Sequence, residues 1–253
     1  MSSKSNRYKF LSSLGAIGLV VYGFFVAQAI TLFIFGALAA SGLITKSGLE
    51  STVTQFIASF VAYALALLII LGIYSAVRNS VKGIPELLGV VNKPKLNALL
   101  YVLAGYFVYF FISFVFMILI HYAVPGFNID ESQEVGFDQL GSQLEFAMAF
   151  LALVVLAPLV EEAIFRGFLF TRLRRNLQFW WTALIVSLVF GLVHMQWNVG
   201  VDVFALSLVL CYVREKTGSI WAGVGIHTLK NAIAFSILFM QFDIEKFVLQ
   251  VLY

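Results

Sequence analysis

The chain has 253 residues, of which 61% are hydrophobic and only 11% are charged. Soluble domains carry about 25% charged residues, so this composition excludes an ordinary soluble protein and predicts a polytopic membrane protein. The formal net charge of +3 gives no indication of a nucleic-acid partner, and the single cysteine, Cys211, excludes an intrachain disulfide.

A transmembrane helix needs about 20 consecutive, mostly apolar residues. The hydrophobic stretches therefore predict an all-α transmembrane bundle of about seven spans, which form one integral membrane domain, 1–253. The predicted spans are residues 12–40, 52–76, 97–123, 144–165, 180–195, 199–214 and 219–240. The remaining tail, 241–253, is too short to span, and the sequence leaves open whether it lies along the interface.

The first apolar stretch has some features of a signal peptide. Basic residues precede it, and Ala27-Gln28-Ala29 has the small-x-small pattern of a cleavage site. However, no charge occurs from Phe10 to Thr45, which is longer than the h-region of a signal peptide. We therefore expect an uncleaved first span.

Loop charges predict the orientation of the bundle. Lysine and arginine exceed acidic residues at the N-terminus and in the loops after the second, fourth and sixth predicted spans. The third loop, in contrast, carries only acids: Asp130, Glu131, Glu134, Asp138 and Glu145. By the positive-inside rule, the N-terminus is cytoplasmic and the C-terminus lies outside.

Three polar clusters interrupt these apolar stretches. They are Glu161, Glu162 and Arg166 in the fourth span, Phe190 and His194 in the fifth, and His227 and Asn231 in the seventh. An ionised side chain at the bilayer centre costs about 3 kcal/mol, so such residues usually have a function. With a helix rise of ~1.5 Å per residue, the three clusters fall in one middle layer, open to the cytoplasmic half. This agreement predicts one shared, water-containing cavity.

Spacing within the clusters indicates different roles. Residues four apart share a helix face, so Glu162 and Arg166 can form an ion pair. Glu161 is rotated by about 100° from Glu162 and is freer to face the cavity. An isolated carboxyl with little water around it suits a general base. His227 and Asn231 are also four apart and point to one side of their helix.

Two neighbouring residues leave alternatives open. Phe190 stacks on His194, where its ring either walls the cavity or holds the imidazole. Pro158 removes the hydrogen bond that the carbonyl of Val154 would accept. The resulting kink either aims the carboxylates inward or is that of an ordinary membrane-helix proline.

Other polar or small residues have simpler interpretations. Lys230 lies in mid-span, so it must snorkel, line the cavity or pair with one of the two glutamates. We expect Asp202 to be a helix-start residue and His121 to be interfacial at the outer end of the third span. Gly223 and Gly225 allow another helix to approach closely, for which packing is a sufficient reason.

A carboxylate and a histidine around one water can activate it for attack on a carbonyl, while a second histidine and an amide donate to the oxyanion. The same residues could instead bind zinc through Glu161, His194 and His227. Neither HExxH nor GxSxG occurs in the sequence. The sequence therefore leaves a metal-independent and a zinc-dependent mechanism open.

In order and spacing, these clusters resemble the CAAX protease and bacteriocin-processing family of intramembrane proteases, also called the CPBP or Abi family. Its motifs, EExxxR, FxxxH and HxxxN, are all present, and the resemblance covers a core of about residues 144–240. The N-terminal spans, 12–123, look like the variable part of the family. The resemblance implies that Glu161 and His194 activate water, that His227 and Asn231 stabilise the oxyanion, and that Glu162 and Arg166 shape the site.

The resemblance implies an endopeptidase with a cavity open to the cytoplasmic side. The family name indicates a metalloprotease, although the residues also fit a glutamate-type enzyme without metal. We expect a multi-pass protein of a prokaryotic plasma membrane that acts on a peptide or a membrane-anchored protein. The alternative is a non-catalytic bacteriocin self-immunity or scaffold protein. A proton-coupled transporter is disfavoured by the lack of inverted repeats.

Overall fold

The computed structural model describes residues 3–93, 98–128, 131, 135–137 and 140–239, and these contain helices but no strand. The tail 241–253, whose placement the sequence leaves open, falls outside them. The helices are α1 (Ser3–Ala40), α2 (Lys46–Leu49), α3 (Thr52–Arg78), α4 (Ile84–Leu88), α5 (Ala98–Ala123), α6 (Gln143–Phe150), η1 (Leu151–Leu156), α7 (Ala157–Glu162), η2 (Ala163–Leu169), α8 (Phe170–Arg174), α9 (Phe179–Leu192), α10 (Trp197–Thr217) and α11 (Trp221–Phe239).

The predicted all-α fold with about seven spans is confirmed. Six helical segments of the described chain are long and apolar enough to cross a membrane, and α9 is a shorter apolar helix. The fourth span is longer than predicted, because α6, η1, α7, η2 and α8 run on as one helical segment, Gln143–Arg174. Between α9 and α10 the chain turns at Met195, whose φ of 57° lies in the left-handed region.

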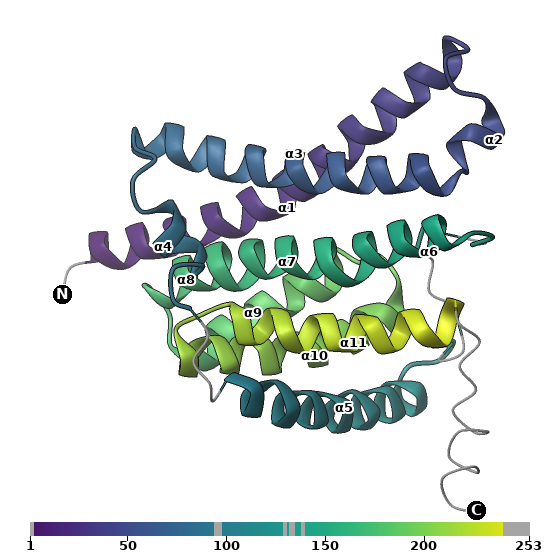
Figure 1. Cartoon of the computed structure of the whole chain (residues 1–253). Helices are drawn as coiled ribbons and strands as arrows, with labels where there is room; N and C mark the ends of the chain where they lie inside the picture. The colour runs from purple at the N-terminus through teal and green to yellow at the C-terminus, as the bar shows by residue number, and fades with distance from the viewer. Residues whose placement is uncertain (1–2, 94–97, 129–130, 132–134, 138–139, 240–253) are drawn as a thin grey trace, which may run out of the picture.

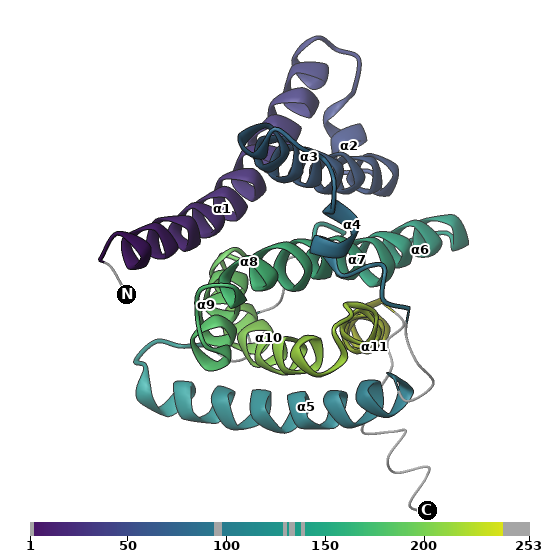
Figure 2. The same cartoon turned by 90° about the vertical axis from the view of Figure 1, so that its left-hand side faces the viewer.

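The helices form layers, which Figures 1 and 2 show from two sides. The α1–α3 pair lies on one side of the molecule, and α5 lies on the opposite side. The continuous α6–α8 segment and helices α9, α10 and α11 lie between them. The three motifs are therefore carried by the inner helices.

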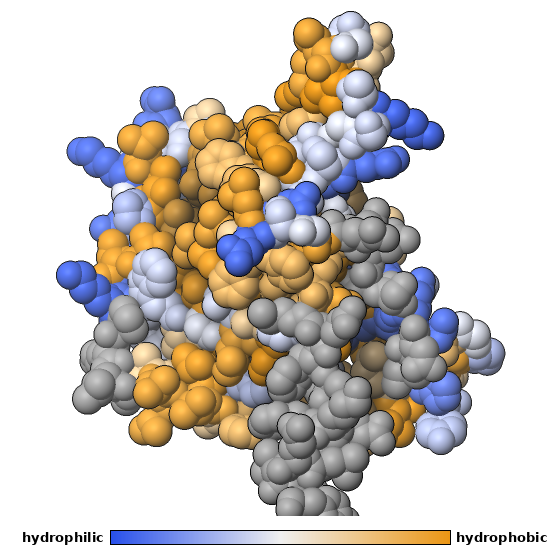
Figure 3. Space-filling view, turned by 45° about the vertical axis from the view of Figure 1, so that its right-hand side comes forward, coloured by the Kyte–Doolittle hydropathy of each residue, from blue (hydrophilic) through white to orange (hydrophobic). Residues whose placement is uncertain are grey.

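The inner and outer helices differ in what they bury. Phe165, Phe168 and Phe190 of the inner helices are at most 1% exposed, whereas Phe33 of α1 and Phe107 of α5 are more than 70% exposed. The surface in Figure 3 accordingly shows broad hydrophobic areas. Large apolar side chains on the outer helices suit contact with lipid. The polar motif residues lie on the inner helices, where protein shields them from lipid.

Two π-helical segments, η1 and η2, flank the short helix that holds the two glutamates. At the end of η1, the N–H of Ala157 donates to the carbonyl of Ala152, five residues back. The next donor in this register would be the N–H of Pro158, which proline lacks. The carbonyl of Leu153 is left to accept from the side chain of Asn231 instead, at 2.8 Å. Single π-turns within α-helices frequently occur at functional sites.

Gly167 in η2 packs directly on the backbone of α4. A Cβ at this position would meet the backbone of Leu88, with its Cα at 2.8 Å. We expect Gly167→Ala to lower the free energy of unfolding by about 1–3 kcal/mol, because two backbones would have to separate. Denaturant unfolding in detergent measures this change.

Gly72→Ala in α3 is the matched control. A Cβ at Gly72 would have nothing within 4 Å, so the change should stabilise the helix by up to about 1 kcal/mol. Equal effects of the two substitutions on unfolding would contradict the close packing of η2 on α4.

Candidate active site

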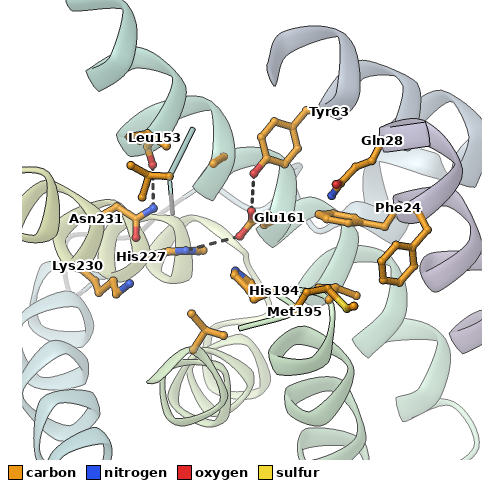
Figure 4. Close-up of a pocket in the computed structure, with 15 residues that line it drawn as sticks. Phe24, Gln28, Tyr63, Leu153, Glu161, His194, Met195, His227, Lys230 and Asn231 are labelled. Carbon is orange, nitrogen blue, oxygen red and sulfur yellow. Dashed lines mark hydrogen bonds and ion pairs between the residues drawn. The ribbon is translucent and has the colours of Figure 1, made fainter. Parts of the chain in front are cut away.

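A cavity of about 320 Å³ lies where α1, α3, α7, α10, α11 and the end of α9 meet (Figure 4). Glu161, His194, His227 and Asn231 all line it, so the structure brings together residues of all three motifs. Its lining residues are Phe24, Phe25, Gln28, Tyr63, Val135, Leu153, Ala157, Glu161, Val193, His194, Met195, Val203, His227, Lys230 and Asn231.

Glu161 is the cavity's carboxylate and is 6% exposed. Its Oε1 accepts a hydrogen bond of 2.6 Å from the hydroxyl of Tyr63, and its Oε2 lies 3.8 Å from Nε2 of His227. Within the described part of the chain, no lysine or arginine forms an ion pair with Glu161.

Glu162 and Arg166 form the expected ion pair. Glu162 Oε1 lies 2.7 Å from a terminal nitrogen of Arg166, and both side chains are fully buried. The same oxygen lies 3.3 Å from Nδ1 of His227, so the pair also joins α7 to α11. Gly223 makes this approach possible, because a Cβ there would lie 2.8 Å from Glu162 Oε2. The glycine thus has a role beside the site, in addition to helix packing.

Phe190 holds the imidazoles rather than walling the cavity. Its ring is fully buried and contacts those of His194 and His227 edge-on, with centroids 4.9 and 5.9 Å apart. The guanidinium of Arg166 covers the ring at 4.4 Å, an attractive cation–π contact. Phe190, a residue of the second motif, therefore contacts Arg166 of the first motif and His227 of the third.

The hydrogen bond of His194 determines its tautomer. Nδ1 lies 2.7 Å from the backbone carbonyl of Phe190, and a carbonyl can only accept, so Nδ1 carries the proton. In the neutral ring Nε2 then holds the lone pair. Because His194 lines the cavity, this nitrogen is the one available to accept a proton from a bound molecule.

Asn231 is anchored by the irregular backbone opposite it. Its Nδ2 donates to the carbonyl of Leu153 in η1, which leaves a second amide hydrogen on the same nitrogen. The sequence prediction places the free carbonyl on Val154, four residues before Pro158. Asn231 binds the carbonyl of Leu153 instead. In the π-helical register a carbonyl accepts from the residue five positions later, so Pro158 leaves Leu153 rather than Val154 without a backbone partner.

Lys230 is paired with Asp202 and not with a glutamate. Their Nζ and Oδ2 atoms lie 3.3 Å apart, and Asp202 Oδ1 accepts from Tyr109 at 2.8 Å and from Ser113 at 2.6 Å. The interpretation of Asp202 as a helix-start residue is wrong, since α10 begins at Trp197 and has no acidic residue in its first turn. The Asp202 side chain instead links α5, α10 and α11. The charge of Lys230 is thereby compensated away from Glu161.

Sequence reasoning missed the contribution of the first two spans. Tyr63 of α3 and Gln28 of α1 both line the cavity and direct their polar ends into it (Figure 4). The sequence offered only a weak signal for these two residues: Gln28 and Tyr63 each carry a polar group within a mostly apolar stretch, 12–40 and 52–76. His121, in contrast, is exposed near the end of α5 beside Tyr122 and does not line the cavity.

The predicted zinc ligands were Glu161, His194 and His227. Among the residues that the structure describes, no three His, Cys, Asp or Glu side chains are grouped so that they could hold a metal ion. The observed arrangement does not fit a three-ligand zinc site, so no step below uses a metal.

Comparisons with known proteins agree with the motifs. The family model described as "Type II CAAX prenyl endopeptidase Rce1-like" matches residues 143–233. The chain is 27% identical over 89 residues to "Putative membrane peptidase YdiL" of Bacillus subtilis (strain 168). This match covers 35% of the chain and only 35% of that relative's length. No solved structure matches the chain.

The matched segment contains all three motifs, the helices from α6 to α10 and the first part of α11. The chain is a multi-pass membrane protein, and its resemblance to the CAAX protease family is confirmed over residues 143–233, which are similar to the type II CAAX prenyl endopeptidases.

Proposed function

We propose that this protein is an intramembrane endopeptidase that hydrolyses a peptide bond with a water activated by Glu161 and His194. The observation that carries the proposal is the convergence of residues from three motifs on one cavity. Glu161 pairs with no lysine or arginine among the described residues, and neutral His194 presents Nε2 as an acceptor. These are the properties of a pair of proton acceptors.

In this proposal a water binds between Glu161 Oε2 and His194 Nε2. Glu161 takes a proton from the water as its oxygen attacks the substrate carbonyl carbon, and the carbonyl electron pair moves to oxygen. The second amide hydrogen of Asn231 donates to this oxyanion. Because Nδ1 of His227 is directed at the Glu162 carboxylate, His227 donates to the oxyanion through Nε2 in its protonated, imidazolium form. When the tetrahedral intermediate collapses, the C–N bond breaks and the leaving nitrogen receives the proton from Glu161.

Glu162, Arg166 and Phe190 act as supports. The Glu162 carboxylate orients His227 through Nδ1, and the Phe190 carbonyl orients His194 through its own Nδ1. In both histidines Nδ1 faces the supporting group, and Nε2, on the other side of the ring, points away from it. Arg166 neutralises Glu162, which would otherwise be a second uncompensated charge beside Glu161.

The substrate class is a peptide or a membrane-anchored protein, and the chain acts as one integral membrane domain. Loop charges support a cavity that opens to the cytoplasmic side. The similarity of residues 143–233 to a family of endopeptidases supports hydrolysis rather than transport or scaffolding.

Purified protein in detergent should cleave members of a quenched fluorescent peptide library. His194→Ala should lower the rate by roughly 10²–10⁴-fold, because the group that accepts a hydrogen bond from the attacking water is lost. His121→Ala is the matched control and should leave the rate unchanged, since His121 is exposed and does not line the cavity.

The same assay with a chelator decides the mechanism. Unchanged cleavage is expected for a metal-independent enzyme, whereas loss that zinc restores would require a metal. If the folded wild-type protein cleaves no peptide, the endopeptidase proposal fails and a non-catalytic binding or immunity function is favoured.

A further inference from the structure

One polar contact to the site comes from outside the segment that matches known peptidases. Tyr63 lies in α3, 98 positions before Glu161 and well before residue 143. Its hydroxyl donates the 2.6 Å hydrogen bond to Glu161 Oε1, and its ring lines the cavity. Figure 4 shows the two side chains pointing toward each other.

Aromatic packing fixes the position of this phenol. Phe24 of α1 contacts Tyr63 edge-on with ring centroids 6.4 Å apart, and contacts Phe165 of η2 at 6.0 Å. Phe165 in turn packs on Phe190 at 4.8 Å, the ring that both histidines contact. The hydroxyl is therefore held by the same aromatic cluster that holds the imidazoles.

The bond makes the two carboxylate oxygens of Glu161 different. Oε1 accepts from a phenol, while Oε2 faces His227 Nε2 across 3.8 Å. A hydrogen bond to a carboxylate is strong when water is excluded, and Glu161 is only 6% exposed. The phenol thus restricts rotation of the carboxylate and leaves one oxygen available.

We propose that Tyr63 is a positioning residue of this site, which holds Glu161 Oε1 so that Oε2 takes the proton from the attacking water. This role rests on the proposed endopeptidase function. It assigns part of the machinery to α3, and therefore to spans that lie outside the matched core.

Tyr63→Phe removes the hydroxyl and keeps the ring. With a library peptide that the wild-type protein cleaves, kcat should fall by roughly 10-fold or more while KM stays within about twofold. Tyr74→Phe is the matched control on the same helix. The Tyr74 ring is also buried against phenylalanine, and its hydroxyl accepts from Arg78, so the same deletion should leave kcat unchanged.

A second measurement tests the contact without any substrate. The thermal unfolding midpoint is compared for Tyr63→Phe, Glu161→Met and the double variant in detergent. Loss of the hydroxyl should lower the midpoint in the wild-type background and have no effect when Glu161 is already methionine, because the partner is gone.

The possible results separate the role from the function. If the wild-type protein cleaves and Tyr63→Phe cleaves equally well, or loses activity only through KM, the positioning role is overturned. Additive effects on unfolding would show that the two side chains do not interact and would overturn it too. If the wild-type protein cleaves nothing, the proposed function fails first, and the role falls with it.

Discussion

Glu161→Gln should reduce peptide cleavage by roughly 10²–10⁴-fold while the protein still folds. The amide has nearly the shape of the carboxylate and keeps an oxygen that accepts from Tyr63, but it cannot take a proton from water. Initial rates with a cleaved library peptide measure the loss, and denaturant unfolding in detergent shows whether the fold persists.

Glu215→Gln is the control for this change. Glu215 is a partly exposed glutamate that pairs with Arg174 at 2.7 Å, away from the cavity lining. Its substitution should leave cleavage unchanged. Equal activity of Glu161→Gln and the wild-type protein would remove Glu161 from the mechanism, whereas equal loss in both variants would point to a general effect of removing charge.

Arg166→Met should lower the free energy of unfolding by about 3–5 kcal/mol. The substitution removes the partner of Glu162 and leaves a fully buried carboxylate without a cation. No hydrogen-bond donor in the described residues reaches Glu162 Oε2 even in the intact protein, so little compensation is available. Denaturant titration in detergent, followed by tryptophan fluorescence, measures the change.

Two further variants separate burial from charge. Arg174→Met breaks the partly exposed pair with Glu215 and should cost at most about 1 kcal/mol, because water solvates the remaining charge. Adding Glu162→Gln to Arg166→Met should recover part of the stability, since the unpaired charge disappears. A loss in Arg166→Met no larger than in Arg174→Met would contradict the buried position of the ion pair.

The spans could be predicted because burial in lipid constrains composition directly. An uninterrupted apolar stretch of about 20 residues is an unambiguous signal, and the predicted spans correspond to the observed helices. The fourth span was predicted too short at residue 165, because the following segment to Arg174 contains Arg166 and Arg172. In the structure Arg166 is fully buried, and its charge is compensated by Glu162 within the same helical segment.

Within the site, local spacing predicted what lies on one helix. Glu162 and Arg166 share a face and form a pair, and Phe190 lies against His194, as expected for residues four apart. The partner of Lys230 could not be predicted in this way, because Asp202 lies on another helix. The roles of Glu161, His194, His227 and Asn231 in hydrolysis remain predictions that the variants above test.

By itself, the sequence determined the membrane location, the helical spans and the three polar clusters, since each depends on residue type and on the period of one helix. Only the tertiary structure decided that Tyr63 donates to Glu161, that Glu162 contacts His227, and that Asn231 binds the carbonyl left free by Pro158. These contacts join residues 65–98 positions apart. They depend on how whole helices pack against one another, which no local pattern encodes.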